Sequence, residues 1–557
     1  MDVCIIGAGW SGLYACKYAL ENGLNPIVLE RRGQPGGVWN FSDDAQTTTV
    51  MKSTVSSSSR LVTEASDFFM DESVGHFMHH EEVLDYLKAY IENFGLAKYI
   101  QYGAHVQSVE KQGQRWLVTY FQDGIRQTVD ATNVAVCAGL HNKQREIGAP
   151  VSNFAGSVVH SGNIKGIRSD EYSANDHVIV YGGGETASDV IDMLVATPAK
   201  ITWAIRGGQH FLRKTLYHQR DGVGQFDKHD FALDTIASPL INGASSFSKG
   251  APGRRYITDF LSTGSVMKYQ GHGIAAWKNN YRYAQQFFNK NGHTVDHVHQ
   301  GRVAAENEIL GVCGHEVEFK SGNRASCTHI ICCFGYEFHC PFLPEKYANG
   351  KLEDHYQFVF PTDDTSIAFL GFTRPIIGSI PMVTEMQCLW ANRVWAGKVQ
   401  LPEESKLVQK QKEINDNWQR KLPDRGRTTT LVLPATYVAM MIKEAYPGRS
   451  PGEHFKRMPL RALKFLSWQP SASMRFAVDP AIDDERFDQL WQQRSHGIFL
   501  GYILPIIILI SRFLQIEKFV DWYVDWSENR RYSTRNDDAE QQGQAVTDTR
   551  GSARRAA

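Results

Sequence analysis

Two glycine-rich turns are the residues of this chain best suited to a chemical task. The first, with the sequence G-A-G-W-S-G, directly follows the apolar stretch 3–6. In a strand–turn–helix unit, the first glycine makes the tight turn, the second lets the backbone approach a pyrophosphate, and the third lets helix and strand pack closely. The positive end of the following helix then faces the phosphates. We therefore predict that Gly7, Gly9 and Gly12 bind a dinucleotide.

Residues that follow the first turn indicate which dinucleotide it binds. Glu30 ends the next apolar stretch, 23 residues after the first glycine, and a carboxylate there accepts hydrogen bonds from a ribose 2′-hydroxyl. The sequence G-G-V-W follows closely, and paired glycines let a backbone lie against a flat ligand. This second backbone contact favours FAD, so Glu30, Gly37, Val38 and Trp39 are predicted FAD contacts.

The second glycine turn, G-G-G-E-T-A, repeats this arrangement with a different charge. Gly182, Gly184 and Ala187 occupy the three fingerprint positions, the last of which tolerates alanine. Arg206 stands 24 residues after the first of them, in the position that Glu30 occupies in the first unit. An arginine there suits a 2′-phosphate, which predicts NADP(H) at this site. The alternative is an ordinary surface arginine at a strand end.

Short apolar stretches alternate with amphipathic ones, and this rhythm restarts after the first unit. We predict strands at residues 3–6, 26–30, 133–137, 177–181, 329–333 and 367–370, and helices at 11–21, 80–94 and 186–196. Alternating strands and helices are typical of parallel sheets covered by helices. The predicted fold is α/β, with two Rossmann-like dinucleotide-binding domains, the FAD domain being interrupted by the NADP domain, and a helical C-terminal extension.

These patterns divide the chain into five segments. The FAD-binding domain is predicted in two parts, at 1–165 and 326–430, on either side of the NADP-binding domain at 166–325. An irregular insertion is expected at about 220–286. A helical C-terminal region at 431–536 contains the apolar segment 498–510, and the polar tail 537–557 is expected to be disordered.

The overall composition excludes several other classes of protein. Lys and Arg number 59 and Asp and Glu 60, for a net charge of −1, which gives no reason to propose a nucleic acid partner. The nine cysteines include no C-x-x-C pair, which argues against a disulfide framework and for a reducing compartment. His293, His297 and His299 lack the accompanying ligands typical of zinc, so no metal is expected.

One further motif suggests a family. The segment 154–160, F-A-G-S-V-V-H, matches the F-x-G-x-x-x-H signature of the flavin-containing monooxygenases, and the two glycine turns have that family's order and spacing. The resemblance extends from residue 1 to about residue 402. The triplet S-D-F at 66–68 and the C-F-G-Y at 333–336 resemble further family segments. The stretch 381–387 resembles the one near the flavin, which makes Gln387 a predicted FAD contact.

Three positions depart from the family pattern. Ile164 stands where the family usually has Tyr or Phe and its Baeyer–Villiger relatives have Trp. Ser57 stands where the family often places an asparagine beside the flavin, which makes it the candidate catalytic residue, with one donor in place of an amide's two. Phe334 replaces a threonine. These departures leave the substrate class open.

The resemblance implies a mechanism carried by the flavin. NADPH reduces FAD, and the reduced flavin adds O2 to form a C4a-hydroperoxide. A soft nitrogen or sulfur of a small amine or thioether then takes the distal oxygen atom. Pro381 suits the first turn of a helix whose positive end would face the flavin. Two alternatives remain: Baeyer–Villiger oxygenation of ketones, which Ile164 disfavours, and a flavin-binding scaffold or oxidase that wastes NADPH.

The apolar segment 498–510 raises the question of a membrane. It is shorter than the roughly 20 residues that a spanning helix needs, and Pro505 interrupts it. A spanning anchor, an interfacial helix and a buried core segment are all compatible with its sequence. The family includes members tied to the endoplasmic reticulum by C-terminal apolar segments. We therefore expect the cytosolic face of that membrane, or the cytoplasm, and no secretion, because the first residues are typical of a buried strand.

Overall fold

The computed structural model describes most of the chain up to residue 449. The described residues are 1–207, 288–376, 378–421 and 429–449, with further positions at 209, 211, 213, 214, 234, 274–277, 475, 478–480, 482, 485 and 489. The predicted insertion at 220–286, apart from 234 and 274–277, lies outside the described residues. The apolar segment 498–510 and the predicted disordered tail 537–557 also lie outside them.

The first unit is built on a five-stranded parallel sheet with the order β18-β7-β1-β2-β3. Its strands are β1 (Val3–Ile6), β2 (Pro26–Glu30), β3 (Ile100–Tyr102), β7 (Asn133–Val136) and β18 (Ile367–Phe369). The apolar runs of the central strands are buried, as expected for a parallel sheet that is covered on both faces.

Two different layers cover this sheet, because successive side chains of a strand point to opposite faces. Val3 and Ile5 of β1 join the core formed with helices α1 (Trp10–Glu21), α3 (His80–Asn93) and α9 (Ile380–Trp395). Cys4 and Ile6 join a second core on the other face. An antiparallel sheet closes that core, formed by β4 (His105–Gln112), β5 (Arg115–Gln122) and β6 (Ile125–Ala131).

The second unit repeats this plan. Its five parallel strands have the order β12-β11-β10-β16-β9. They are β9 (Ser157–His160), β10 (His177–Tyr181), β11 (Lys200–Ala204), β12 (Val303–Glu306) and β16 (His329–Cys332). Helix α4 (Glu185–Leu194) packs on one face. The other face is covered by an antiparallel sheet of β13 (Ile309–Cys313), β14 (Glu316–Phe319) and β15 (Arg324–Ser326).

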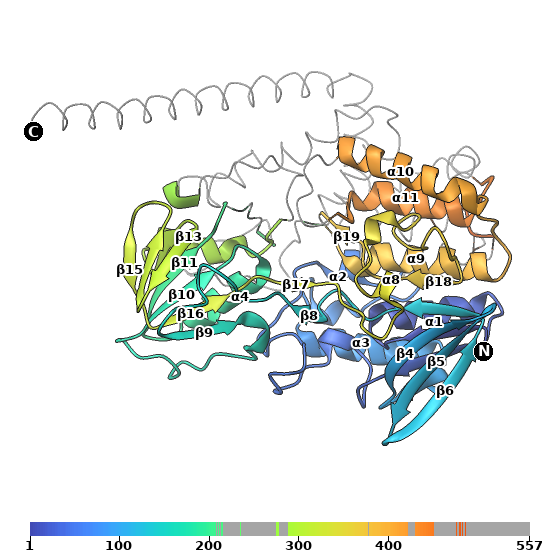
Figure 1. Cartoon of the computed structure of the whole chain (residues 1–557), viewed down its shortest axis with the longest axis horizontal. Coiled ribbons are helices and arrows are strands. Elements are labelled where there is room, and N and C mark those ends of the chain that lie inside the picture. The colour runs from blue at the N-terminus through green and yellow to red at the C-terminus, as the bar shows by residue number, and fades with distance from the viewer. Residues whose placement is uncertain are drawn as a thin grey trace, which may run out of the picture.

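Among the described residues, one passage at 143–144 leads from the first unit towards the second and another at 336–337 leads back, and the two passages pair with each other. They form the antiparallel strands β8 (Lys143–Gln144) and β17 (Tyr336–Glu337), with a Lys143–Glu337 ion pair of 2.6 Å. Figure 1 shows the two sheets in separate lobes with β8 and β17 between them. Because β18 completes the first sheet after the second unit has ended, the predicted fold class, with its interrupted first domain, is confirmed.

Strand pairing refines the segment boundaries that the sequence predicts. β9 precedes the predicted start of the NADP domain at 166, and β16 follows its predicted end at 325, yet both strands belong to the second sheet. Pairing depends on residues far apart in the chain, so local patterns do not reveal which sheet a strand joins. The nine predicted strands and helices themselves match the observed elements within about two residues at each end.

The described residues after 401 are mainly helical, as predicted. Helices α10 (Glu404–Lys421) and α11 (Pro434–Ala445) both contribute to the core of the first unit, where α11 packs against α9 and Trp418 of α10 lies against Tyr437 of α11. Shorter elements are α2 (Arg60–Thr63), α7 (Asp296–His299), α8 (Glu345–Ala348), β19 (Arg374–Pro375) and β20 (Leu431–Val432). None of the helices in the described part of the chain has the length and apolar character that crossing a membrane requires.

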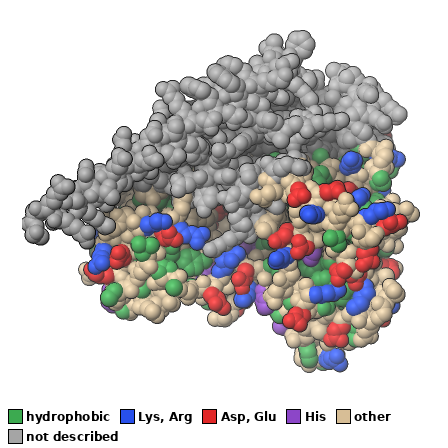
Figure 2. All heavy atoms as spheres, turned by 45° about the horizontal axis from the view of Figure 1, so that its top comes forward, with side chains coloured by type: hydrophobic (Ala, Val, Ile, Leu, Met, Phe, Trp, Pro, Cys, Tyr) green, Lys and Arg blue, Asp and Glu red, His purple; other side chains and the backbone are tan. Residues whose placement is uncertain are grey.

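Charge is evenly distributed over the surface that can be seen. On the face shown in Figure 2, acidic and basic side chains of the described residues are interspersed, without a broad patch of either sign. This distribution agrees with the net charge of −1.

Candidate functional site

The first glycine turn joins β1 to α1 with very little space. Gly7 has φ +105°, and a Cβ atom on it would lie 2.6 Å from the carbonyl oxygen of Cys137. A Cβ atom on Gly12 would lie 1.8 Å from the carbonyl oxygen of Gly7, which no rearrangement of a side chain relieves. The first and third fingerprint positions therefore require glycine, because helix and strand meet through their backbones.

The second predicted FAD segment lies directly against this turn. Gly36 donates its N–H to the carbonyl oxygen of Ala8 at 2.9 Å. Gly9 and Gly37 face each other so closely that a Cβ atom on Gly37 would lie 3.2 Å from the Cα atom of Gly9. Gly37 begins a short turn that continues through Val38 and Trp39. The structure thus brings together the glycine residues that the sequence predicts for FAD.

Glu30 and the helix start complete this site. The buried Glu30 carboxylate accepts hydrogen bonds from the N–H of Ala8 at 2.7 Å and from the N–H of Arg32 at 2.9 Å, which fixes it beside the glycine turn. No side chain caps the N-terminus of α1, where Gly9 is the N-cap residue. Free backbone donors and a positive helix end are what a pyrophosphate needs. The residues present therefore fit a dinucleotide.

The second glycine turn has the same construction and is more open. Gly182 has φ +141°, and a Cβ atom on it would lie 2.5 Å from the carbonyl oxygen of Cys333. Gly184 is the N-cap residue of α4, without a side-chain cap, and no atom lies within 4 Å of a Cβ atom built on it. Ala187 is fully buried under the sheet. Arg206 is exposed and lies two residues beyond the end of β11 at Ala204, rather than on the strand itself.

Ser57 contacts the second unit. Its hydroxyl donates to Oε2 of Glu185 at 2.8 Å, across 128 residues of sequence. Glu185 is the first residue of α4, and its other carboxylate oxygen accepts the backbone N–H of Lys290 at 3.3 Å. No sequence pattern predicts a role for Glu185 or Lys290. The only local signal was the position of Glu185 within the second glycine turn.

Gln387 is fully engaged within the protein. Its Oε1 accepts the N–H of Gly371 at 3.1 Å, and its Nε2 donates to Thr373 and to Tyr437 at 2.8 Å each. A Cβ atom on Gly371 would lie 2.1 Å from Oγ of Ser11, so Gln387 fixes a backbone segment that touches the first glycine turn. The amide of Gln387 therefore reaches the first glycine turn through the backbone of Gly371. A direct contact between Gln387 and FAD stays a prediction.

The helix predicted at Pro381 is present as α9. Ser379 is its N-cap residue, and the serine Oγ accepts the N–H of Met382 at 3.2 Å while donating to the carbonyl oxygen of Val62. Pro381 lies in the first turn, where a missing N–H removes no hydrogen bond.

The other departures from the family pattern are packing residues in the structure. The Phe334 ring meets the ring of Tyr181 edge-on, with centroids 5.3 Å apart. Ile164 packs against the core between α4 and the second sheet. The signature histidine His160 is buried, its Nδ1 accepts the N–H of Gly162 at 3.0 Å, and its Nε2 lies 3.1 Å from the carbonyl oxygen of Gly335. These bonds order the turn between the units.

Two of the three histidines considered for a metal are explained by another contact, and the third, His299, is exposed. His293 and His297 both contact the carboxylate of Asp192, with the closest approaches at 2.9 and 3.5 Å. Within the described ranges, no group of three or more His, Cys, Asp or Glu side chains is arranged to hold a metal ion.

A buried polar cluster ties the S-D-F segment to α1 and α9. The fully buried carboxylate of Glu385, on α9, accepts hydrogen bonds from the N–H and hydroxyl of Ser66 and from the hydroxyl of Tyr18 at 2.8 Å. Lys17 donates to the neighbouring Asp67 at 2.7 Å. Burial raises the pKa of Glu385, and the charge of Asp67 adds to this effect.

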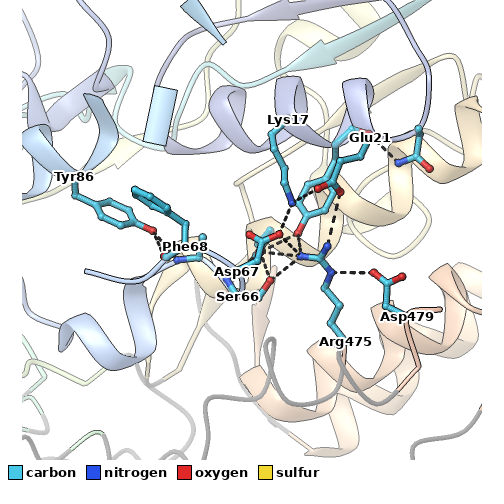
Figure 3. Close-up of polar contacts among 12 residues, drawn as sticks. Lys17, Glu21, Ser66, Asp67, Phe68, Tyr86, Arg475 and Asp479 are labelled. Atoms are coloured by element: carbon cyan, nitrogen blue, oxygen red, sulfur yellow. Dashed lines mark hydrogen bonds and ion pairs between the residues drawn. The ribbon is translucent and has the colours of Figure 1, made fainter. Parts of the chain in front are cut away.

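Arg475 completes this cluster from beyond the segment that resembles the family. Its Nη1 donates to Tyr18 at 2.8 Å and to Ser66 and Asp67 at 2.9 Å, and its Nε pairs with Asp479 at 3.2 Å (Figure 3). Desolvation acts to raise the pKa of Asp67, but Lys17 and Arg475 hold it well below the ordinary value. No local sequence pattern indicates Arg475, because 409 residues separate it from Ser66.

Comparison with known protein families assigns the chain to a class of enzymes that agrees with this geometry. The family model for flavin-binding monooxygenase-like proteins matches residues 1–445, and the chain belongs to this family. The resemblance inferred from the sequence is thereby confirmed, and with it the expectation of a flavoprotein monooxygenase with FAD and NADP(H) as cofactors.

The individual relatives and solved structures share less than a third of their residues with this chain. Flavin-containing monooxygenase 5 of Oryctolagus cuniculus is 27% identical over 442 residues, which cover 77% of this chain and 79% of the relative. The 4-hydroxybenzoate brominase (decarboxylating) of Pseudoalteromonas luteoviolacea is 28% identical over 452 residues, covering 79% and 83%. Among solved structures, S-allyl-L-cysteine S-oxygenase from Allium sativum has a TM-score of 0.56 and 19% identity, covering 88% of this chain and 98% of that one. Cyclohexanone monooxygenase from Rhodococcus sp. Phi1 bound to NADP+ has a TM-score of 0.53 and 16% identity, covering 80% and 98%.

Replacing Arg475 tests whether the buried cluster supports the flavin unit. Arg475→Met should lower the free energy of unfolding by about 3–5 kcal/mol, because it leaves buried carboxylates without their partner. It should also lower the ratio of flavin to protein absorbance after purification. Arg475→Lys should restore part of both. Arg168→Met removes a solvent-exposed arginine with acidic neighbours and serves as the control. Equal urea midpoints for Arg475→Met and the control would contradict this role.

Proposed function

We propose that this chain is an FAD-dependent monooxygenase that uses NADPH and O2 to oxygenate a soft nitrogen or sulfur atom of a small amine or thioether. The observation that carries this proposal is the pair of complete dinucleotide turns joined by the Ser57–Glu185 contact, with an exposed arginine after the second. For FAD we propose contacts with Gly7, Gly9, Gly12, Glu30, Gly37, Val38, Trp39 and, through Gly371, Gln387. For NADP(H) we propose Gly182, Gly184, Ala187 and Arg206.

The residues of the chain bind and orient the reactants in this proposal. When bound, the flavin supplies hydride acceptance and oxygen transfer, and NADPH supplies the hydride. The uncapped start of α1 would hold the FAD pyrophosphate, and Glu30 would hold its ribose. The uncapped start of α4 would hold the NADPH pyrophosphate in the same way. Ser57 lies between the two units and can position a group there with one hydroxyl.

The proposed substrate class follows from the chemistry of the nucleophile, whereas the cofactors follow from membership of the family. The relatives named above include monooxygenases and a brominase, so membership of the family does not select a substrate. Similarity to the S-oxygenase and to cyclohexanone monooxygenase concerns the fold alone. A soft nitrogen or sulfur nucleophile is favoured because it needs no enzymic base, and Ile164 carries no support for the Baeyer–Villiger alternative.

Product analysis tests the proposed reaction. Purified protein with NADPH and ¹⁸O2 should convert a tertiary amine or a thioether to its N-oxide or S-oxide, with one labelled oxygen per NADPH consumed. A panel of tertiary amines, thioethers and cyclic ketones should therefore give labelled product from the first two groups. Labelled lactone from the ketones alone would support the Baeyer–Villiger reaction. Hydrogen peroxide in place of labelled product from every compound would support the oxidase alternative.

Coenzyme preference tests the role of Arg206. Arg206→Ala should weaken NADPH binding by about ten- to a hundredfold, because charged hydrogen bonds to a phosphate contribute about 1.5–3 kcal/mol. NADH binding should hardly change, since NADH has only a hydroxyl at that position. Arg126→Ala, which removes an exposed arginine of β6 in the first unit, is the control. Equal losses for NADPH and NADH in titrations of flavin reduction would exclude phosphate recognition by Arg206.

We also propose that the segment 498–510 contacts a membrane on its cytosolic side, although it lies outside the described residues. Its apolar composition supports this proposal. A chain that ends at residue 497 should retain FAD and stay in the supernatant when membranes are pelleted, whereas the full chain should need detergent for release. Loss of FAD and aggregation of the shortened chain would instead identify the segment as part of the protein core.

A further inference from the structure

A buried three-residue segment of the second unit, Asn289-Lys290-Asn291, lies beside the start of α4. The exposed fractions of its residues are 0%, 5% and 2%. Asn289 donates its side-chain amide to the carbonyl oxygen of Gly183 at 3.0 Å and to Oγ of Ser188 at 2.9 Å. One asparagine therefore holds both the second glycine turn and the first turns of its helix.

The second asparagine holds the same helix at two further points. Asn291 donates its side-chain amide to Oδ1 of Asp189 at 2.9 Å and to the carbonyl oxygen of Glu185 at 3.5 Å. Its backbone N–H donates to Oδ1 of Asn289 at 2.9 Å. Because both asparagines bond to the same helix start, the segment moves with the second glycine turn as one body.

The two asparagines bond to the second unit, whereas the side chain of Lys290 extends into the first unit. Its ammonium donates to Oγ of Ser58 at 2.6 Å and to the carbonyl oxygen of Gly378 at 3.2 Å. The Ser58 hydroxyl itself donates to the same carbonyl at 2.7 Å. Gly378 directly precedes Ser379, the N-cap residue of α9. A buried ammonium is unfavourable unless it is hydrogen-bonded, so these acceptors define where Lys290 must lie.

Glu185 forms a second hydrogen-bonded link between the two units, next to the Lys290–Ser58 bond. It joins the hydroxyl of Ser57 to the backbone N–H of Lys290 through its two carboxylate oxygens. The neighbouring serines 57 and 58 therefore each bond to a different charged residue of the second unit. Hydrogen bonds to charged groups are shorter and more directional than neutral ones, so the pair restricts both sliding and rotation between the units.

We infer that Lys290 is a positioning residue, which fixes the NADP-binding turn relative to the start of α9 and the Ser57–Ser58 segment. This inference rests on the proposed function, in which hydride passes from NADPH bound to the second unit to FAD bound to the first. The reaction requires the two reacting atoms at a defined short distance, and a displacement of about 1 Å costs on the order of a hundredfold in rate. In this inference Lys290 contacts neither of the reacting atoms and acts only by setting the relative position of the two units.

Anaerobic stopped-flow reduction tests this role. Lys290→Met should lower the limiting rate of flavin reduction at saturating NADPH by about ten- to a hundredfold. The dissociation constant for NADPH should change little, and reduction by dithionite should be unaffected. Lys290→Arg should restore part of the rate. Lys111→Met is the control, because Lys111 also donates to a serine hydroxyl, Ser366, but within the first unit. An unchanged limiting rate, or a loss confined to NADPH affinity, would overturn the inference.

Two further measurements separate this inference from the proposed function. Hydrogen–deuterium exchange without coenzyme should show faster exchange at residues 56–59 and 378–382 in Lys290→Met but not in Lys111→Met, and equal exchange would overturn the inference. Ser58→Ala removes one of the two acceptors of the Lys290 ammonium and should slow reduction without adding to the effect of Lys290→Met. It serves as the test if the methionine variant fails to fold. A wild-type protein that NADPH does not reduce would contradict the proposed function, while the exchange result still decides whether Lys290 joins the units.

Discussion

In both units the glycine turn that precedes the helix packs backbone to backbone against a neighbouring segment, Cys137 in the first unit and Cys333 in the second, and the surrounding residues are arranged around this close approach. A Cβ atom on Gly12 would overlap the carbonyl oxygen of Gly7 at 1.8 Å, so no larger side chain is possible there. Such an approach leaves the first N–H groups of α1 and α4 without side-chain caps and turned to the carboxyl edge of each sheet. This geometry is suited to phosphate binding, because free backbone donors and the positive end of a helix dipole favour an anion.

The two units also share their layering, which explains how one chain folds two such sites. In each, alternate residues of the central strand face a helix on one side and a three-stranded antiparallel sheet on the other. The paired passages β8 and β17 join the units with only two residues each. Side-chain contacts at the serine segment, Ser57–Glu185 and Ser58–Lys290, add to this connection.

Buried cations recur where distant segments meet. Arg475 joins the C-terminal region to α1 and the S-D-F segment, and Lys290 joins the second unit to the start of α9. Replacing a whole buried ion cluster by apolar residues often preserves stability, whereas removing a single member is strongly destabilising, so stability alone does not account for such clusters. A buried charge accepts only those arrangements that satisfy its hydrogen bonds, whereas an apolar contact tolerates small shifts. We therefore interpret both cations as devices that fix geometry.

The sequence alone determined the glycine turns, most strands and helices, the α/β class, the order of the units and the family. These features follow from local spacing: period-two and period-3.6 burial, and glycines where backbones must meet. Tertiary structure alone decided which sheet β9 and β16 join, that Gln387 lies behind the first turn, and that Ser57 contacts Glu185. It also placed Lys290 and Arg475. The residues in those contacts lie up to 457 positions apart, and local periodicity carries no information about contacts between segments so distant in the chain.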